Sequence, residues 1–190
     1  IRYSTNFSKL IFKKKHIFEY WKHFPNLELY ISIDGVGKIG EYVRKGYDDK
    51  LFNQNVLDYK NSGIKHTDYA YAITYGTLNY LHLFDMVLDF IKRDFIDKDV
   101  SKGGRTLFFS PIDYPTYYDS VFLPDEFKDK FRKRLQGFKF ELEKTGVSSS
   151  VIQDILGKLN TVYKRSISKD FKFDEMSKCK DMTDKLDSIR

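Results

Sequence analysis

The sequence predicts an α/β fold in which parallel βα units are followed by C-terminal helices. Short runs rich in β-branched and aromatic residues alternate with longer segments whose apolar residues recur at helical spacing. The chain has 190 residues, 41% of them hydrophobic and 17% aromatic, which is enough to form one real core. Strands and helices that alternate in this way favour a parallel sheet.

The elements follow from these patterns in chain order. The predicted strands are residues 2–4, 27–33, from 65 or 68 to 75, and 105–110. The predicted helices are residues 17–24, 48–59, 81–91, 124–144, 149–164 and 174–189. Asp48 is a favourable residue to open its helix, Gly63 to end it, and Pro124 to occupy a first helical position.

The pattern changes after the fourth predicted helix, where Thr145-Gly-Val-Ser-Ser-Ser150 interrupts it. We therefore expect an α/β domain over residues 1–146 and a helical extension over residues 147–190. A first strand that begins at residue 1 leaves one sheet edge bare, which is an aggregation hazard. We expect further βα units before this segment, or a partner that replaces them.

Composition narrows the class of protein. No run of about eighteen apolar residues is present, and the first residues do not resemble a signal peptide, so we expect a cytoplasmic protein without a membrane partner. The single cysteine, Cys179, excludes an internal disulfide and lies on an apolar helical stripe, where a core position is expected.

The net charge of +6 raises the question of nucleic-acid binding. The longest basic runs, Lys13–Lys15 and Arg132–Arg134, are predicted on solvated helix exteriors. Because no alternation of aromatic and basic residues accompanies either run, a nucleic-acid partner is not expected.

Residues 29–46 are the most informative part of the sequence. They contain Gly35-x-Gly37-x-x-Gly40, the spelling of a dinucleotide-binding turn. Such a turn opens a helix directly, and an acidic residue ends the following strand about twenty positions later. The segment after Gly40 has no clean apolar stripe, and the candidate acid, Asp58, lies inside a predicted helix. We therefore interpret the glycines as a turn.

Polar residues also gather at the predicted carboxyl ends of all four strands, which share one edge in a parallel α/β fold. They are Thr5 and Asn6, Ser32 and Asp34, the segment 74–79, and the segment 110–114. Arg44 adds a fork of donors that matches a carboxylate, so an amino-acid moiety with a ribose is a plausible ligand. Alternatively, Asp34 and Gly35 only form the turn and Arg44 only pairs with a neighbouring acid.

An ordered series of motifs resembles the second half of a radical S-adenosylmethionine (radical SAM) domain, and is most similar to twitch-domain-containing radical SAM proteins. The series comprises Thr5-Asn6, Trp21-Lys-His-Phe24, Ile31-Ser-Ile-Asp-Gly-Val-Gly37, Glu41-Tyr-Val-Arg-Lys-Gly46, Asn55, Tyr114-Pro115 and Leu123-Pro124. The similarity extends to Leu186-Asp-Ser-Ile-Arg190. It implies half of a partial, TIM-like (βα) barrel.

The resemblance implies an enzyme in which a 4Fe-4S cluster cleaves S-adenosylmethionine to a 5′-deoxyadenosyl radical that abstracts a substrate hydrogen. By position, Ser32 and Asp34 contact the amino-acid or ribose part of the cofactor, Arg44 binds its carboxylate, and Asn6 lines the same cleft. The full set of implied cofactor-binding residues is Asn6, Ser32, Asp34, Gly35, Arg44, Thr74 and Asn79, with Tyr114 as a weaker candidate.

The chain departs from the family pattern because it lacks the CxxxCxxC cluster motif and the Gly-Gly-Glu turn. Cluster ligation needs several thiolates, so the 4Fe-4S cluster is expected only from residues outside this chain, supplied by the missing half of the barrel or by another subunit. The chain alone is expected to be inactive. The substrate is expected to be a small molecule or a peptide. Alternatively, the chain is a non-catalytic module of the same fold or, less favoured, a nucleotide-dependent oxidoreductase.

Overall fold

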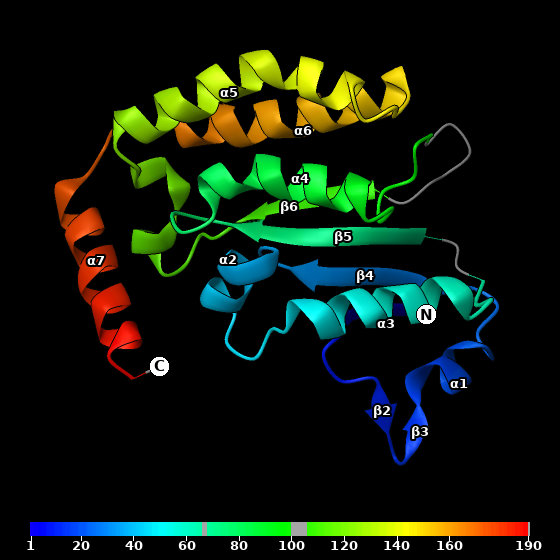
Figure 1. Cartoon of the computed structure of the whole chain (residues 1–190). Helices are drawn as coiled ribbons and strands as arrows, with labels where there is room; N and C mark the ends of the chain where they lie inside the picture. The colour runs from blue at the N-terminus through cyan, green and yellow to red at the C-terminus, as the bar shows by residue number, and fades with distance from the viewer. Residues whose placement is uncertain (66–67, 100–105, 190) are drawn as a thin grey trace.

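A computed structural model describes residues 1–65, 68–99 and 106–189. Its main sheet has four parallel strands: β1 (Arg2–Thr5), β4 (Glu28–Ile33), β5 (Asp68–Tyr75) and β6 (Thr106–Pro111). They lie side by side in the order of the chain, β1-β4-β5-β6 (Figure 1). The predicted parallel α/β arrangement is therefore confirmed.

Seven α-helices are assigned among the described residues. They are α1 (Ile17–Trp21), α2 (Gly37–Val43), α3 (Asp49–Asn61), α4 (Leu83–Lys92), α5 (Asp125–Glu143), α6 (Ser149–Ser166) and α7 (Phe173–Asp187). The 3₁₀ turns η1 (Tyr80–His82), η2 (Thr116–Tyr118) and η3 (Ser120–Phe122) lie between them. Asp48 caps α3 as predicted, since its carboxylate accepts a hydrogen bond from Leu51 N at 2.9 Å.

Two elements differ from the sequence prediction. Lys13–Lys15 do not lie on a helix exterior, because β2 (Ile11–Phe12) and β3 (Lys15–His16) form a short antiparallel hairpin. Strands of two residues are too short to show an alternating pattern. Helix α2 was also not predicted, and it begins at Gly37, inside the glycine motif.

All the crossovers between successive strands run in the same direction across the sheet. Because such crossovers are right-handed, the connecting helices collect on one face. That face is the apolar one: Leu29, Ile31 and Ile33 are fully buried. Aromatic rings from α3 and α4 pack on β5, with Tyr59 stacked on Tyr69.

The opposite face of the sheet is more open. On β4, Tyr30 and Ser32 are only half-buried, although they alternate with fully buried neighbours. Phe108 on β6 is 56% exposed. Parallel sheets usually have both faces covered, so this asymmetry is a distinctive property of the chain.

Helices α5 and α6 lie side by side next to α4 (Figure 1), and α6 also contacts β6. Phe131 and Phe138 of α5 pack on Phe84 of α4, with ring centroids 4.5 and 4.9 Å apart. Ile155 and Leu159 of α6 belong to the same buried cluster as the strands.

The division at residue 146 stays a prediction. The longest helix, α5, has 19 residues and is highly charged, and no helix in the described part of the chain could span a bilayer.

Helices α2, α3 and α4 are joined by one partly buried charged network centred on Asp49. Its carboxylate accepts hydrogen bonds from Gly37 N at 2.9 Å and Tyr47 OH at 2.8 Å, and pairs with Arg93 at 2.9 Å. Burial would raise the pKa of Asp49, but the bonds from Arg93, Gly37 and Tyr47 outweigh it and lower that pKa.

We predict that Asp49→Asn lowers the free energy of unfolding at pH 7 by about 1.5–3 kcal/mol, because it removes a charge-assisted pair. The native carboxylate has a lowered pKa, so its contribution is full above the unfolded value and disappears as the pH falls through the folded value. Urea unfolding should therefore show the difference shrinking below the ordinary value of 3.8. Asp58→Asn, an exposed change on the same helix, should cost less than about 0.5 kcal/mol, and an equal loss in both variants would contradict the assignment.

Candidate functional site

A cavity of about 170 Å³ lies at the carboxyl ends of β4 and β5. Its polar lining residues are Asp34, Thr74, Thr77, Asn79 and Tyr118. Val43 of α2, Leu186 of α7, Leu78 and Ile112 supply the apolar lining. Three of the residues predicted from the sequence, Asp34, Thr74 and Asn79, are thus brought together at one site.

Asn79 ties the ends of the two central strands together. Its side-chain amide donates to the carbonyl oxygens of Asp34 at 2.6 Å and Thr74 at 2.8 Å, and its Oδ1 accepts from Gly76 N at 2.8 Å. The residue is 97% buried, since only 3% of it is exposed. Its position therefore fixes where the backbone of both strands ends, and gives the cavity a rigid wall.

Arg44 pairs with Asp34 next to the cavity, although it is not itself one of the lining residues. Arg44 Nη1 lies 3.2 Å from Asp34 Oδ2 and donates to the Ser32 carbonyl oxygen, also at 3.2 Å. The predicted alternative, that Arg44 pairs with a neighbouring acid, is therefore realised in the structure. Asp34 Oδ1 is buried and has no hydrogen-bond partner among the described residues. A buried acceptor of this kind is costly unless a donor reaches it.

The glycine turn allows the close approach of α2 to the end of β4. A Cβ on Gly40 would lie 2.5 Å from Gly35 O and 2.7 Å from a ring carbon of Tyr47, so position 40 requires glycine. Gly35 is similarly restricted, since its Cβ would lie 3.0 Å from Gly40 N. Gly35 has a structural role in the turn.

The start of α2 is already occupied by groups of this chain. Gly37 N donates to the partly buried carboxylate of Asp49, and Val36 N donates to Nε2 of His82 at 3.4 Å. Burial lowers the pKa of His82, which keeps the imidazole in the neutral form that can accept this bond. A pyrophosphate at this position would face the Asp49 carboxylate. Helix α2 opens directly from the glycine motif, which a dinucleotide-binding turn requires and the sequence did not predict. The second requirement, an acidic residue at the end of the next strand, is not met because Asp58 lies within α3.

The loop after β6 closes another side of the cavity. Thr77 N donates to the Tyr118 carbonyl at 2.9 Å, and Ile112 N donates to the Tyr75 carbonyl at 2.8 Å. The Tyr118 hydroxyl is buried without a hydrogen-bond partner in the described part of the chain. Tyr114, the weaker sequence candidate, is 88% exposed and does not line the cavity. Tyr118 lines the cavity in the position that was expected for Tyr114.

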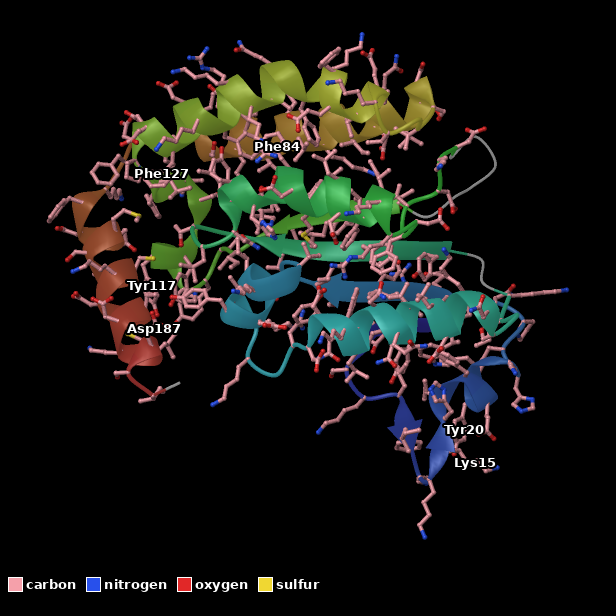
Figure 2. The ribbon with its side chains drawn as sticks, in the orientation of Figure 1. Lys15, Tyr20, Phe84, Tyr117, Phe127 and Asp187 are labelled. Atoms are coloured by element: carbon pink, nitrogen blue, oxygen red, sulfur yellow. The ribbon has the colours of Figure 1, made fainter. Side chains whose placement is uncertain are left out.

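Helix α7 covers the carboxyl edge of the sheet (Figure 1). Tyr42 of α2 donates to Asp187 at 3.0 Å, and Figure 2 labels this aspartate near the end of the helix. Thr116 donates to Glu175 at 2.8 Å. Cys179, the only buried residue of α7, lies 3.4 Å from Thr77 Oγ1. A few polar contacts and one buried side chain thus hold the helix over the cavity.

The remaining predicted residues lie elsewhere. Asn6 is exposed at the end of β1, where its Oδ1 accepts from Ser8 N and Ser8 Oγ, and it does not line the cavity. Ser32 contributes its backbone carbonyl oxygen, which accepts the hydrogen bond from Arg44. Thr77 belongs to the polar segment 74–79 that the sequence places at this edge. Val43 and Leu186 were not predicted, because only the folding of α2 and α7 onto the strand ends brings them there.

No protein-family model, curated protein or solved structure matches this chain. The described residues also contain no group of three or more His, Cys, Asp or Glu side chains that could hold a metal ion.

We predict that Asn79→Ala destabilises the protein by at least about 2 kcal/mol, because it leaves two carbonyls and one N–H without their buried partner. Asn6→Ala removes only an exposed turn contact and should cost less than about 0.5 kcal/mol. Denaturant unfolding of the two variants provides a matched comparison. Similar losses in both would show that Asn79 does not hold the strand ends.

Proposed function

We propose that the cavity binds S-adenosylmethionine, and that the chain is the cofactor-binding half of a radical SAM enzyme. The observation that carries the proposal is the buried Oδ1 of Asp34, which has no donor among the described residues. Asp34 lines the cavity at the carboxyl edge of a parallel sheet. An ammonium group or a ribose hydroxyl would supply the missing donor.

The charges of the site support an amino-acid moiety. The guanidinium of Arg44 uses Nη1 for Asp34 and Ser32 and makes no other hydrogen bond to the described residues. Its remaining donors could bind the carboxylate of the cofactor while Asp34 binds the amine. Opposite charges held next to each other in this way match a zwitterion.

The sheet supports a barrel-like architecture. Strands in sequential order with helices on one face are the arrangement of a singly wound barrel, in which the uncovered face points inward. The side chains of Ala70 and Ala72 are small, so they leave space over the middle of that face. Ser32 and Thr74 make its carboxyl end polar. The missing half of a partial TIM-like barrel, or a subunit that supplies it, is the partner that would complete such a face.

The residues of this chain do not fit an iron–sulfur cluster. The sole cysteine, Cys179, is 4% exposed, belongs to α7 and contacts Thr77. The cluster would have to be held by residues outside this chain. With its cluster, the cofactor supplies radical chemistry, and the role of the residues seen in this structure is to bind and orient it and to exclude water.

Two further functions are weaker. A non-catalytic module of the same fold would keep the cavity without a cluster-bearing partner. A dinucleotide-dependent oxidoreductase is disfavoured by the Asp49 carboxylate at the start of α2. The substrate is proposed to be a small molecule or a peptide, and the proposed location of the protein is the cytoplasm.

We predict that Asp34→Asn and Arg44→Ala each weaken binding of S-adenosylmethionine by about 1.5–3 kcal/mol, because each removes a charge-assisted contact with the zwitterion. Titration calorimetry measures the effect. Arg132→Ala, an exposed change on α5, is the matched control and should leave the affinity unchanged. Full affinity in both site variants would rule out the proposed binding mode.

We also predict that α7 moves when the cofactor binds. The cavity of about 170 Å³ is smaller than the roughly 300–1,000 Å³ of pockets that hold ligands of this size. Leu186 forms part of its wall, so the helix must be displaced. The reaction of Cys179 with dithiobis-nitrobenzoate should therefore be slow in the free protein and faster with S-adenosylmethionine.

Tyr42→Phe removes the bond to Asp187 and should accelerate the thiol reaction without ligand. Tyr114→Phe changes an exposed tyrosine and should have no effect. Protection of Cys179 by the cofactor would show that α7 closes instead of opening.

A further inference from the structure

The β2–β3 hairpin projects from the body of the protein (Figure 1). Ile11 pairs with His16 and Phe12 with Lys15, which leaves Lys13 and Lys14 as the two turn residues. Both turn lysines have positive φ, at 46° and 65°. Figure 2 labels Lys15 on this hairpin, close to Tyr20 of α1.

The two lysines of this turn are unfavourable for the stability of the hairpin. Two-residue hairpins with positive φ at both positions strongly prefer Asn-Gly or related pairs, since a Cβ is strained in the left-handed region. Two consecutive lysines therefore need another explanation. Strained residues of this kind often mark functional positions.

The hairpin and its surroundings are one of the strongly basic stretches of the chain. Residues 9–23 contain five lysines and one glutamate, a local net charge of +4 out of +6 for the whole chain. Lys13, Lys14 and Lys15 are all exposed at the tip. A concentrated charge on a projecting element favours a polyanionic partner.

Apolar side chains accompany these charges. Ile11 is 65% exposed and Phe12 is 53% exposed. The Phe12 ring makes an edge contact with Tyr20 at 6.0 Å, and Lys13 Nζ lies 5.5 Å from its centroid. Although aromatic and basic residues do not alternate along this run, the fold places the rings of Phe12 and Tyr20 beside its lysines.

An open groove of about 400 Å³ runs between this hairpin and α3. Lys9 and His16 line it together with the exposed apolar side chains of Ile11 and Leu51. Basic and apolar groups in one groove match the phosphate and the base of a nucleotide.

We infer that the β2–β3 hairpin and this groove bind single-stranded nucleic acid. Lys13, Lys14 and Lys15 contact phosphates, and Phe12 offers a face on which a base stacks. An anionic membrane fits less well, because the lysines occupy the tip and insertion would bury the charges deeper than Ile11 and Phe12. This inference is independent of cofactor binding at the cavity.

Fluorescence anisotropy with a labelled oligothymidylate of about 15 nucleotides tests the inference on the whole chain. The triple variant Lys13→Gln, Lys14→Gln, Lys15→Gln should bind roughly tenfold more weakly at low salt. The slope of log affinity against log salt should become shallower by about 2, from three lost phosphate contacts. The control variant Lys130→Gln, Lys133→Gln, Lys139→Gln loses the same charge on α5 and should bind like the native chain.

Phe12→Ala should weaken binding roughly 5- to 100-fold through lost stacking, with little change in the salt slope. Phe140→Ala is its control, because Phe140 is 63% exposed on α5 with Lys144 Nζ 4.0 Å from its ring centroid. Lys14→Gly should raise the melting temperature and weaken binding, since glycine relieves the strained φ but removes a cation.

Equal losses in the hairpin and α5 variants would overturn the inference, because binding would then reflect net charge alone. No oligonucleotide binding together with hairpin-dependent binding to phosphatidylserine vesicles would show that the partner is a membrane, which would also overturn it. Thermal melting of every variant establishes that the loss is not caused by unfolding.

Discussion

The handedness of the strand crossovers is the constraint on which the rest of this structure depends. Each successive strand is added on the same side of the previous one, and right-handed connections then place the helices on a single face. The fully buried face of β4 and the stacked tyrosines of α3 and β5 follow from this choice. The more open opposite face follows as well.

The same winding brings the polar ends of the strands to one edge. There the chain secures its backbone with a side chain, since Asn79 bonds both strand ends and thereby fixes the carbonyl of Asp34. In the described part of the chain, Asp34 Oδ1 has no hydrogen-bond partner, although Oδ2 lies beside Arg44. A rigid frame with one unsatisfied charged group is the usual character of a binding site, where local stability is given up for function.

The cover over this edge is held much less firmly than the sheet beneath it. Helix α7 buries only Cys179, whereas α4 buries six residues. Elements with few buried contacts open at low free energy, so they are suited to move when a ligand binds. The hairpin at residues 11–16 shows a different use of marginal structure, because it displays charged and aromatic groups away from the core.

The sequence by itself determined the parallel α/β class, the capped start of α3, and the gathering of Asp34, Thr74 and Asn79 at one edge. These features depend on local patterns and on a general rule of parallel sheets, so they could be predicted. The pairing of Arg44 with Asp34, the cover by Leu186 and the exposure of Asn6 and Tyr114 were decided only by tertiary structure. They depend on contacts between segments far apart in the chain, and the hairpin depends on strands too short to leave a periodic signal.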